Sequence, residues 1–439
     1  MKDFALIFPY DKTNRYSYNV LLGALETHEI FNHTDIFLLR PNDPSFIETT
    51  KKISEVHKKT IIGVSFLSTQ IEKIVKLTQK LTKLRKSKKT LLLAGGPHPS
   101  GSPHTTLNLG YDYVVIGEGE ETFIRFVDAF FNNNEDILKI KGLMYWDENE
   151  RKYKYTGRQQ LVVLDNYPPF AVKSKHFNPI EITRGCPYRC GFCQTSFLFK
   201  PIVRHRSIEK IAFYVEYLKK LGLTDIRVIS PNAFSYGSRD GKTVNVGKLE
   251  ELLSRIREII GSKGRLFFGT FPSEVRPEAI SEETLQLLKK YTNNKSITVG
   301  IQSGSDRILK LANRGHSVEE AVEAIRLALS FGFRVDADFI FGFPWEEEQD
   351  INETIEVMKT LVNMGAVIHA HTFMPLPGTP LGNTTPKEID RRLQREIGKL
   401  SSGRKLYGQW SIQRELGKKI IYYQKLLKEQ FKPHAPVFP

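Results

Sequence analysis

The chain has 439 residues, of which 40% are hydrophobic and 26% are charged, and its formal net charge is +15. This is the composition of an ordinary globular protein, and the length predicts two or three domains. No apolar run reaches the roughly 18 residues that suggest a transmembrane helix, so we expect no membrane span. The opening MKDFALIFPYDK lacks the long apolar region of a signal peptide, which predicts a cytoplasmic protein.

Residues 1–132 alternate short apolar runs with segments of helical spacing. Between the third and fourth runs, QIEKIVKLTQKLTKLRKSKK repeats its apolar residues with a helical period. Short buried strands with intervening helices predict an α/β domain built on a doubly wound, Rossmann-like parallel sheet. The predicted strands are FALIFPY (4–10), TDIFLLR (34–40), TIIGVSFLST (60–69), TLLLAGG (90–96) and YDYVVIG (111–117).

Small residues gather at the carboxyl ends of three of these strands, which is where ligands of such sheets bind. The stretches are SFLST, GGPHPSGSP and GEGEETF. Their small side chains would let a flat ligand approach the backbone closely.

Residues 133–178 are predicted to be a linker. Within it, IKGLMYWDENERKYKYTG has a polar centre between two alternating segments, which predicts a β-hairpin. LDNYPPF then predicts an extended, proline-stiffened approach to the next domain.

A second run of strand and helix patterns covers residues 179–385. Six such units are too few for a closed eight-stranded barrel and predict a partial (β/α)6 barrel of the TIM type. Chemistry in such a barrel belongs at the carboxyl ends of the strands. The predicted strands are PIEITRG (179–185), DIRVISP (225–231), LFFGTFP (266–272), SITVGIQ (296–302), VDADFIFGF (335–343) and AVIHAHTFMP (366–375).

The chain has three cysteines, Cys186, Cys190 and Cys193, all within EITRGCPYRCGFCQTS. A disulfide scaffold does not fit, because such scaffolds are usually short, secreted and dense in cysteine. A structural zinc site usually takes four protein ligands, and no histidine lies in the segment 180–200 to supply a fourth. Three thiolates instead suit an iron–sulfur cluster with one iron left open to a ligand that is not protein.

The stretch RGCPYRCGFC, with Phe192 before the last cysteine, resembles the cluster loop of the radical S-adenosylmethionine (radical SAM) superfamily. The resemblance implies a [4Fe-4S] cluster whose open iron chelates SAM and cleaves it to a 5'-deoxyadenosyl radical. It also implies an external electron donor of the flavodoxin or ferredoxin type.

The first domain resembles the cobalamin-binding domain that precedes many radical SAM barrels, on GVSFLSTQ, AGGPHPS and DYVVIGEGEETF. The D-x-H-x-x-G signature of a histidine lower ligand is missing, since DKTNRYSYN follows the first strand. The chain is thus similar to the cobalamin-dependent radical SAM family. The cobalamin contacts implied are Ser65, Ser68, Gly95, Gly96, Pro97, Gly117, Glu118 and Gly119.

Local motifs that resemble other radical SAM enzymes suggest the SAM contacts. GIQSGSDRILKLANRG resembles a segment of oxygen-independent coproporphyrinogen oxidases, which implies Gln302 for the ribose and Arg314 for the SAM carboxylate. SEVRP implies Glu274 for the ribose hydroxyls, and FIFGFP implies packing against adenine. Many relatives have G-G-E at the second strand; here Asn232 could accept the bond from the SAM amino group. The predicted contacts are Phe192, Asn232, Ser273, Glu274, Gln302, Ser303, Arg314 and Gly342.

The resemblance implies methyl transfer from SAM through cobalamin to an unactivated carbon of an unknown substrate. Three alternatives stay open: a non-methylating cyclisation or rearrangement, a nucleic-acid modification, and a nonenzymatic corrinoid-binding module. A methylthiotransferase would need a second cluster and three further cysteines, which the chain lacks. The sequence identifies no catalytic acid or base.

Residues 386–439 are predicted to be a helical, basic extension. They hold 13 Lys and Arg against five Asp and Glu, which accounts for about half of the net charge. A solvated helical surface explains this pattern, and so does a docking face for an acidic partner, a nucleic acid or an anionic lipid.

Overall fold

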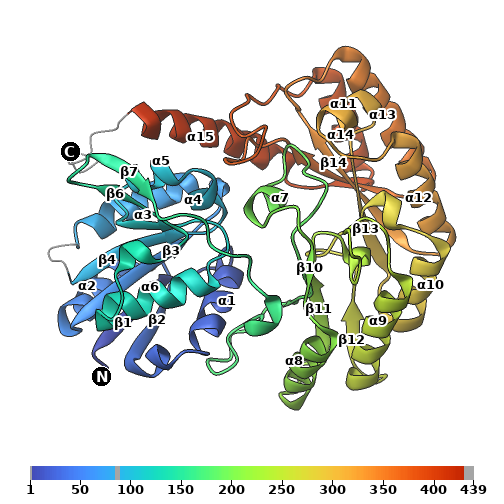
Figure 1. Cartoon of the computed structure of the whole chain (residues 1–439). Coiled ribbons are helices and arrows are strands. Elements are labelled where there is room, and N and C mark those ends of the chain that lie inside the picture. Colours follow the sequence, from blue (N-terminus) through green and yellow to red (C-terminus); the bar gives the residue numbers. More distant parts are fainter. Residues whose placement is uncertain (1, 85–88, 430–439) are drawn as a thin grey trace. The chain divides into compact units, whose positions relative to one another are not determined.

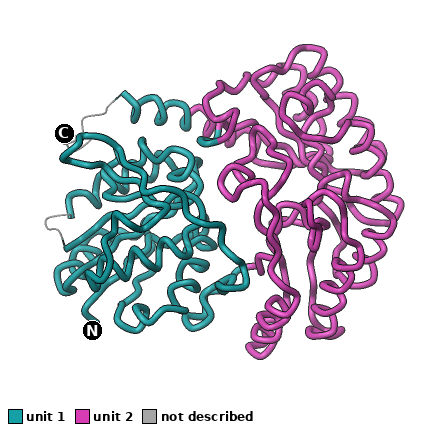
Figure 2. The backbone as a smooth tube through the Cα atoms, in the orientation of Figure 1, with its two compact units in different colours: residues 1–178, 376–378, 419–439 teal, residues 179–375, 379–418 magenta. Residues whose placement is uncertain are grey.

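The computed structural model describes residues 2–84 and 89–429. They fall into two compact units, shown in Figures 1 and 2. Unit 1 comprises the described residues of Met1–Asn178, Leu376–Gly378 and Lys419–Pro439, and unit 2 comprises Pro179–Pro375 and Thr379–Lys418. None of the described helices is long and apolar enough to cross a membrane.

Unit 1 is built on a seven-stranded sheet with the order β2-β1-β3-β4-β5-β6-β7. The first five strands are parallel, as predicted, because buried runs such as ALIFP in β1 are covered by helices on both faces. Their bounds are β1 (Phe4–Pro9), β2 (Thr34–Leu39), β3 (Lys59–Ser65), β4 (Thr90–Gly95) and β5 (Tyr113–Val115).

The predicted hairpin forms and extends this sheet. Strands β6 (Leu143–Asp147) and β7 (Lys152–Tyr155) pair antiparallel, and β6 also pairs antiparallel with β5. Edge strand β7 is short and rich in lysine, which protects the open side of the sheet from further pairing.

Helices cover both faces of the sheet in unit 1 (Figure 1). On one face, apolar residues of α1 (Arg15–Leu25) and α6 (Glu120–Asn132) pack with Leu6 and Phe8 of β1. The other face is covered from α2 (Phe46–Val56), α3 (Ile71–Thr82), α5 (Pro103–Asn108) and the end of α15 (Trp410–Glu429). Short helix α4 (Pro97–Gly101) follows β4 directly.

Unit 2 is a partial barrel made of two parallel sheets, β12-β11-β8 and β13-β14-β15-β16. The two sheets are linked by a bridge between Val275 and Val299. The strands are β8 (Ile180–Glu181), β11 (Asp225–Ile229), β12 (Arg265–Phe267), β13 (Ser296–Gln302), β14 (Arg334–Phe341), β15 (Val367–Thr372) and β16 (Leu406–Tyr407). The helices are α7 (Thr195–Leu198), α8 (Ile208–Lys220), α9 (Val246–Ile260), α10 (Glu282–Tyr291), α11 (Asp306–Leu311), α12 (Val318–Ser330), α13 (Glu348–Asn363) and α14 (Arg391–Ser402).

Two features of unit 2 differ from the prediction. The first predicted strand is split, because β8 pairs with β11 while β9 (Thr183–Arg184) turns to pair antiparallel with β10 (Arg204–His205). The extension after residue 385 is not all helical, since β16 adds a short parallel strand beside β15. The closing residues 436–439, expected to be extended, lie outside the described part of the chain.

Candidate cofactor site

The cysteine loop lies between β9 and α7 and is held by backbone hydrogen bonds. The Gly191 N–H donates to the Ala312 carbonyl at 2.9 Å, and the Leu381 N–H donates to the Gly191 carbonyl at 3.1 Å. All three cysteines are free thiols; Cys190 is buried, and Cys186 and Cys193 are partly exposed. Segments distant in sequence therefore hold the cysteine loop in place.

Two arginines face the buried sulfur of Cys190. The Nη1 atoms of Arg276 and Arg314 lie 3.7 Å and 3.6 Å from Cys190 Sγ. Arg276 also donates to the Arg314 carbonyl, and Arg314 Nη2 donates to the Gly300 carbonyl at 2.6 Å. Positive charge next to a thiol favours the thiolate, which is the form that ligates iron. The donor set thus fits an iron–sulfur cluster.

Arg276 was not predicted as a site residue, although it lies in the same SEVRP motif as Glu274. It is buried and packs on the Tyr188 ring at 3.4 Å from the ring centroid. Its Nε donates to Glu278 at 2.6 Å. Although burial favours the neutral acid, the contact with His316, whose Nδ1 lies 3.5 Å from Glu278 Oε2, and the charge of Arg276 hold the pKa of Glu278 at about 2. Glu278 is therefore an anion that balances Arg276.

Three buried donors at predicted SAM contacts have no hydrogen-bond partner among the described residues. They are Asn232 Nδ2, Ser273 Oγ and Arg314 Nε. Buried polar groups are nearly always paired, so unpaired ones in one region indicate a missing ligand. Asn232 and Arg314 belong to one network, because Asn232 Oδ1 accepts from the Arg276 N–H at 3.3 Å and Arg276 contacts Arg314, while Ser273 lies three residues before Arg276 in the chain. Their donors fit the carboxylate and ribose oxygens of SAM.

The same geometry changes the expected role of Asn232. Its side-chain oxygen, predicted to accept a bond from the SAM amino group, accepts one bond from the Arg276 N–H and has a second lone pair. The amide nitrogen is the free atom, so Asn232 is placed to donate to an oxygen of the ligand.

Gln302 lies at the end of β13 with an unusual backbone. Its φ is +75°, and the pairing of β13 with β14 shifts register between Val299 and Gln302. A Cβ on Gly300 would meet Gln302 Nε2 at 2.5 Å and Arg314 Nη2 at 2.8 Å. The bare backbone of Gly300 therefore allows the two predicted side chains to lie together. Backbone strain of this kind concentrates at functional sites.

The remaining predicted contacts on the barrel differ in their surroundings. Burial raises the pKa of Glu274 to about 7, and the Asp338 carboxylate adds to this, so Glu274 is partly protonated at neutral pH. Phe192 packs edge-on against Phe343, with ring centroids 5.8 Å apart. The Ser303 hydroxyl accepts from the Ser305 N–H at 3.2 Å and so serves the turn that begins α11.

Gly342 has a close backbone neighbour of its own. Its φ is +80°, and a Cβ there would meet the Lys387 carbonyl at 2.8 Å. The turn after β14 therefore requires a glycine at this position for its backbone, independently of any contact with a ligand.

In unit 1, the predicted turns after β3 and β4 lie against each other. A Cβ on Gly96, where φ is +96°, would meet Ser65 Oγ at 2.7 Å and the Phe66 nitrogen at 3.1 Å. At Gly95, a Cβ would meet only the Val115 Cβ, at 3.8 Å. Gly96 is followed by Pro97 at the first position of α4. This crowded, side-chain-free turn fits close approach by a flat macrocycle such as cobalamin.

Ser68 and the buried His98 are joined by a hydrogen bond of 3.0 Å between Ser68 Oγ and His98 Nδ1. Burial lowers the pKa of His98 to about 4. Its ring stacks on Phe66, so it packs inside the unit and stays neutral.

The turn after β5 carries the last predicted contacts of unit 1. The Gly117 N–H donates to Ser100 Oγ at 3.0 Å, and Gly119 precedes α6. The buried carboxylate of Glu118 accepts from the Val162 N–H at 2.8 Å. Glu118 therefore fixes Val162, which follows the β6–β7 hairpin, to the turn after β5.

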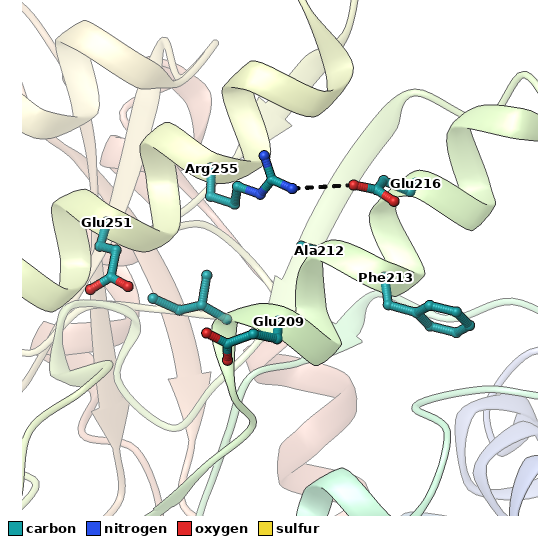
Figure 3. A pocket seen from close by; sticks show the side chains of 7 residues that line it. Glu209, Ala212, Phe213, Glu216, Glu251 and Arg255 are labelled. Atoms are coloured by element: carbon teal, nitrogen blue, oxygen red, sulfur yellow. Dashed lines mark hydrogen bonds and ion pairs between the residues drawn. The ribbon is translucent and has the colours of Figure 1, made fainter.

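Two surface hollows contain none of the predicted contacts. One, of about 430 Å³, lies between α8 and α9 and is lined by Glu209, Phe213, Glu251 and Arg255 among others (Figure 3). The other, of about 730 Å³, is in unit 1 and is lined by Tyr10, Asp11, Arg40 and His176 among others.

Comparison with known families decides the assignment. Residues 180–358 match the model of the radical SAM superfamily, and residues 16–127 match the model of the B12 binding domain. The chain therefore combines a B12-binding domain with a radical SAM domain. Its radical SAM domain holds the cysteine loop, Gln302 and Arg314, and its B12-binding domain holds the turns around Gly96.

One curated relative and two solved structures are described here for their similarity to this chain. The relative, from Methanocaldococcus jannaschii, bears the name "Putative methylthiotransferase" and is 29% identical over 76% of this chain and 70% of its own. The radical SAM methyltransferase TsrM from Kitasatospora setae has a TM-score of 0.69, 18% identity, and coverage of 87% of this chain and 74% of its own. The cobalamin-dependent S-adenosylmethionine radical enzyme OxsB has a TM-score of 0.64 and 15% identity. The match covers 95% of this chain and 56% of the OxsB chain. These structures share the fold of the radical SAM enzyme described here.

These two domains imply three cofactors: a [4Fe-4S] cluster, SAM and cobalamin.

Proposed function

We propose that this radical SAM enzyme is a methyltransferase that passes a methyl group from SAM, through cobalamin, to an unactivated carbon of its substrate. The observation that carries the proposal is the group of unpaired buried donors beside the arginine pair at Cys190, in a chain that also has a B12-binding domain. The name of the TsrM structure, a radical SAM methyltransferase with cobalamin and a [4Fe-4S] cluster bound, supports the same chemistry.

The count of cysteines argues against methylthio transfer. The radical SAM cluster uses all three cysteines of the chain and leaves none for the second cluster that such transfer requires. We therefore do not propose methylthio transfer for this chain, although the relative from Methanocaldococcus jannaschii bears that name.

In the proposed mechanism, the bound cofactors supply the electron for SAM cleavage and the carrier for the methyl group. The chain contributes binding and orientation. Cys186, Cys190 and Cys193 hold the cluster, while Arg276 and Arg314 place positive charge beside Cys190 Sγ. Arg314 Nε is left to bind the SAM carboxylate, for which a guanidinium is suited.

Further side chains would position the rest of SAM and exclude water. Glu274, with its pKa near neutrality, can donate to or accept from a ribose hydroxyl. Phe192 and Phe343 form an apolar wall beside the cysteine loop. An apolar wall keeps water from a reactive radical.

The test needs no knowledge of the substrate. Protein purified without oxygen is reconstituted with iron, sulfide and hydroxocobalamin, then given SAM with a deuterated methyl group and a strong reductant. We expect S-adenosylhomocysteine to form as the label moves to cobalamin, and 5'-deoxyadenosine to form as well. Deoxyadenosine without S-adenosylhomocysteine would indicate a non-methylating rearrangement. Bound corrinoid with neither product would indicate a carrier module.

The structure makes Arg314 the most direct test of the SAM site. Arg314→Ala should weaken SAM binding by about 1.5–3 kcal/mol, because a charged hydrogen bond to the carboxylate is lost. Calorimetric titration of the reconstituted protein with SAM measures this, and iron analysis shows whether the cluster is retained.

Arg307→Ala is the matched control. Arg307 lies seven residues earlier, on α11, and its guanidinium is paired with Asp350, so it should not affect SAM affinity. Unchanged SAM affinity in Arg314→Ala would remove Arg314 from the site.

A further inference from the structure

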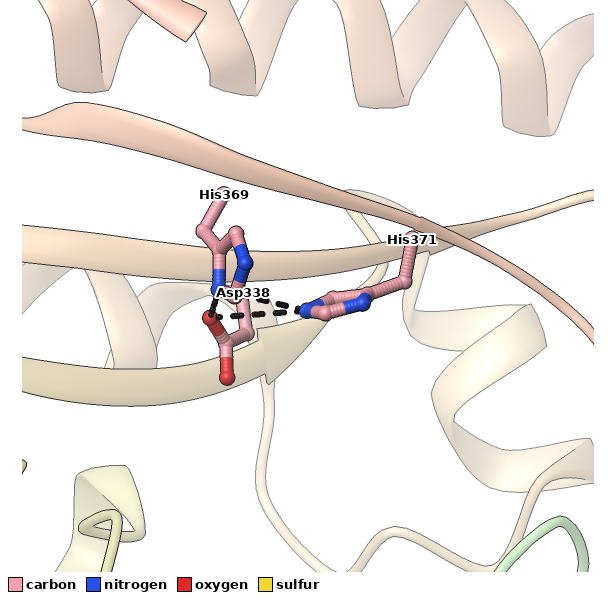
Figure 4. Close-up of side chains that lie close together, drawn as sticks. All are labelled: Asp338, His369 and His371. Atoms are coloured by element: carbon pink, nitrogen blue, oxygen red, sulfur yellow. Dashed lines mark hydrogen bonds and ion pairs between the residues drawn. The ribbon is translucent and has the colours of Figure 1, made fainter. Parts of the chain in front are cut away.

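Two histidines and an aspartate lie together on the inner face of the barrel, and the proposed function does not use them. Asp338 is on β14, and His369 and His371 are on β15 (Figure 4). They belong to two of the predicted strands, VDADFIFGF and AVIHAHTFMP. Imidazole and carboxylate groups are the usual nitrogen and oxygen ligands of zinc and related ions.

The register of the strands brings the three side chains together. His369 and His371 are two residues apart, so both project from the same face of β15. Asp338 is the register partner of His369 on the neighbouring strand. Ile340, two residues after Asp338, packs against the same apolar cluster as Phe192 of the cysteine loop. The three side chains therefore lie on the face of the barrel that meets the cysteine loop.

One atom of each side chain faces the other two. Asp338 Oδ1 lies 2.7 Å from His369 Nδ1 and 3.9 Å from His371 Nε2, and the two nitrogens are 3.2 Å apart. Ligand atoms of a tetrahedral zinc ion are about 3.3 Å from one another, because each lies about 2.0–2.1 Å from the metal. The observed separations lie on either side of this value, so the three atoms have the spacing of three corners of such a site.

Protons alone cannot satisfy the contacts of these side chains. The Thr372 N–H donates to Gln413 Oε1 at 2.9 Å, so the NH2 group of Gln413 faces His371 Nδ1, at 3.1 Å. If Nδ1 accepts from that group, neutral His371 carries its proton on Nε2 and donates it to His369 Nδ1. His369 Nδ1 then has neither a proton to give to Asp338 nor a lone pair left to accept one.

The opposite assignment moves the conflict without removing it. A proton on His369 Nδ1 can be donated to Asp338, but His371 Nε2 must then be the atom without a proton. His371 would carry its proton on Nδ1, where it meets the NH2 group of Gln413. Each arrangement of protons on these rings leaves two donors or two acceptors in contact. A cation resolves the convergence, because it binds a lone pair of all three inward-facing atoms at once.

The surrounding charge also favours a cation. Asp338 is buried, and no lysine or arginine lies within salt-bridge distance of it in the part of the chain that the structure describes. Asp336, on the same face of β14, is also buried, and its Oδ1 has no partner among residues 2–84 and 89–429. The carboxyl groups of Asp336 and Glu274 lie within charge–charge range of His369. Buried carboxylates are normally paired with a cation or bound to a metal.

We propose that Asp338 Oδ1, His369 Nδ1 and His371 Nε2 bind one divalent transition-metal ion, in a site separate from the cysteine loop. Three protein ligands leave one position open, which is the arrangement of catalytic zinc sites. About a quarter of each histidine side chain is exposed, so the ion is accessible. The open position takes an oxygen or nitrogen atom of the substrate and orients it. This role rests on the proposed function, whereas the binding of the ion does not.

Metal binding requires Gln413 to change its hydrogen bonds. A ligating Nε2 carries no proton, so the proton of His371 is on Nδ1 and needs an acceptor. Gln413 Oε1 has two lone pairs, and after a rotation of the amide it can accept from this proton and from the Thr372 N–H. Gln413→Glu supplies acceptors to both groups without that rotation.

Zinc binding by the reconstituted full chain tests the proposal. Zn²⁺ is the probe because nitrogen and oxygen sites bind it more tightly than Fe²⁺, so iron left from reconstitution does not block the site. Equilibrium dialysis and metal analysis should find about one zinc ion per chain in addition to the cluster. X-ray absorption at the zinc edge should show nitrogen and oxygen neighbours at about 2.0–2.1 Å and no sulfur at about 2.3 Å.

Variants of the ligands locate the ion. Asp338→Asn, His369→Gln and His371→Gln should each weaken zinc binding by more than about 100-fold, which exceeds the effect of changing an outer-shell partner. Asp35→Asn is the matched control. Asp35 lies 3.2 Å from His57 in unit 1, a histidine–carboxylate pair that lacks the second histidine, so this variant should bind zinc as the wild-type protein does.

Gln413→Glu keeps the test decisive if the ligand variants do not fold. It should strengthen zinc binding by about 10-fold or more, because its carboxylate accepts the proton on His371 Nδ1. Gln413→Glu/His371→Gln should lose this gain.

Three results would overturn the proposal. They are a wild-type protein that retains no zinc, bound zinc whose neighbours include sulfur, and a zinc affinity that neither His371→Gln nor Gln413→Glu changes. None of them depends on methyl transfer, so a failure here is distinct from a failure to form S-adenosylhomocysteine.

Discussion

Replacing Cys186, Cys190 and Cys193 together with alanine should remove the iron–sulfur cluster and with it all cleavage of SAM. The three side chains supply every thiolate of the chain, so no other cysteine can replace them. We expect iron to fall from about four atoms per chain to background, the visible absorbance of the cluster to vanish, and 5'-deoxyadenosine to become undetectable. Iron and sulfide analysis after anaerobic reconstitution measures the loss.

The single variants should differ from one another. Cys190 is the buried cysteine whose sulfur faces Arg276 and Arg314. Cys190→Ala therefore removes the sulfur that both guanidinium groups face, although Arg276 keeps its ion pair with Glu278, whereas Cys186→Ala leaves these contacts in place. Loss of a hydrogen bond from a charged group costs about 1.5–3 kcal/mol, so Cys190→Ala should lower the unfolding temperature more than Cys186→Ala.

Ser196→Ala is a control within the same loop. It removes only the hydrogen bond from the Arg189 N–H to Ser196 Oγ, and it should retain the cluster. Protein prepared without oxygen that contains zinc and no sulfide would contradict the cluster assignment, as would a cluster that survives in the triple variant.

Gly96→Val should abolish loading of cobalamin. A side chain at residue 96 would meet Ser65 Oγ at 2.7 Å and the Phe66 nitrogen at 3.1 Å, and the backbone there has a φ of +96°. A branched residue is strained at positive φ, and its methyl groups would fill the surface of the turn. We expect the corrinoid absorbance that remains with the wild-type protein after desalting to be lost from the variant.

Gly95→Ala provides the matched control at the neighbouring position. Its new methyl group would meet only Val115 Cβ, at 3.8 Å, which is an ordinary contact. This variant should keep its corrinoid. Both variants should still form 5'-deoxyadenosine, because the cysteine loop belongs to the other unit. Equal corrinoid content in Gly96→Val and the wild-type protein would show that the turn after β4 is not part of the cobalamin site.

Much of the fold could be predicted from the sequence because local patterns determine it. The buried runs of β1, β3 and β4 are continuous and apolar, which is typical of parallel strands covered on both faces. The spacing of the three cysteines depends on the geometry of one short loop, so it is readable in eight residues. Both features arise from neighbours along the chain.

Contacts between distant segments could not be predicted in this way. Arg276 is 86 residues from Cys190, and nothing in SEVRP indicates that its guanidinium meets that sulfur. The hydrogen bond from the Arg276 N–H to Asn232 Oδ1 joins residues 44 apart, and it leaves the amide nitrogen of Asn232 as the unpaired atom. The two-residue strand β16 forms only because β15 offers a free edge to pair with.

The sequence by itself thus determined the family-defining chemistry of this protein: three thiolates in one loop, six barrel strands, and glycine-rich turns on a parallel sheet. The tertiary structure alone decided which donors remain unpaired at Asn232, Ser273 and Arg314, and which two guanidinium groups face Cys190. The physical reason is that a motif is set by local backbone geometry, whereas a hydrogen-bond partner is set by whichever strand or loop the fold brings within about 3 Å.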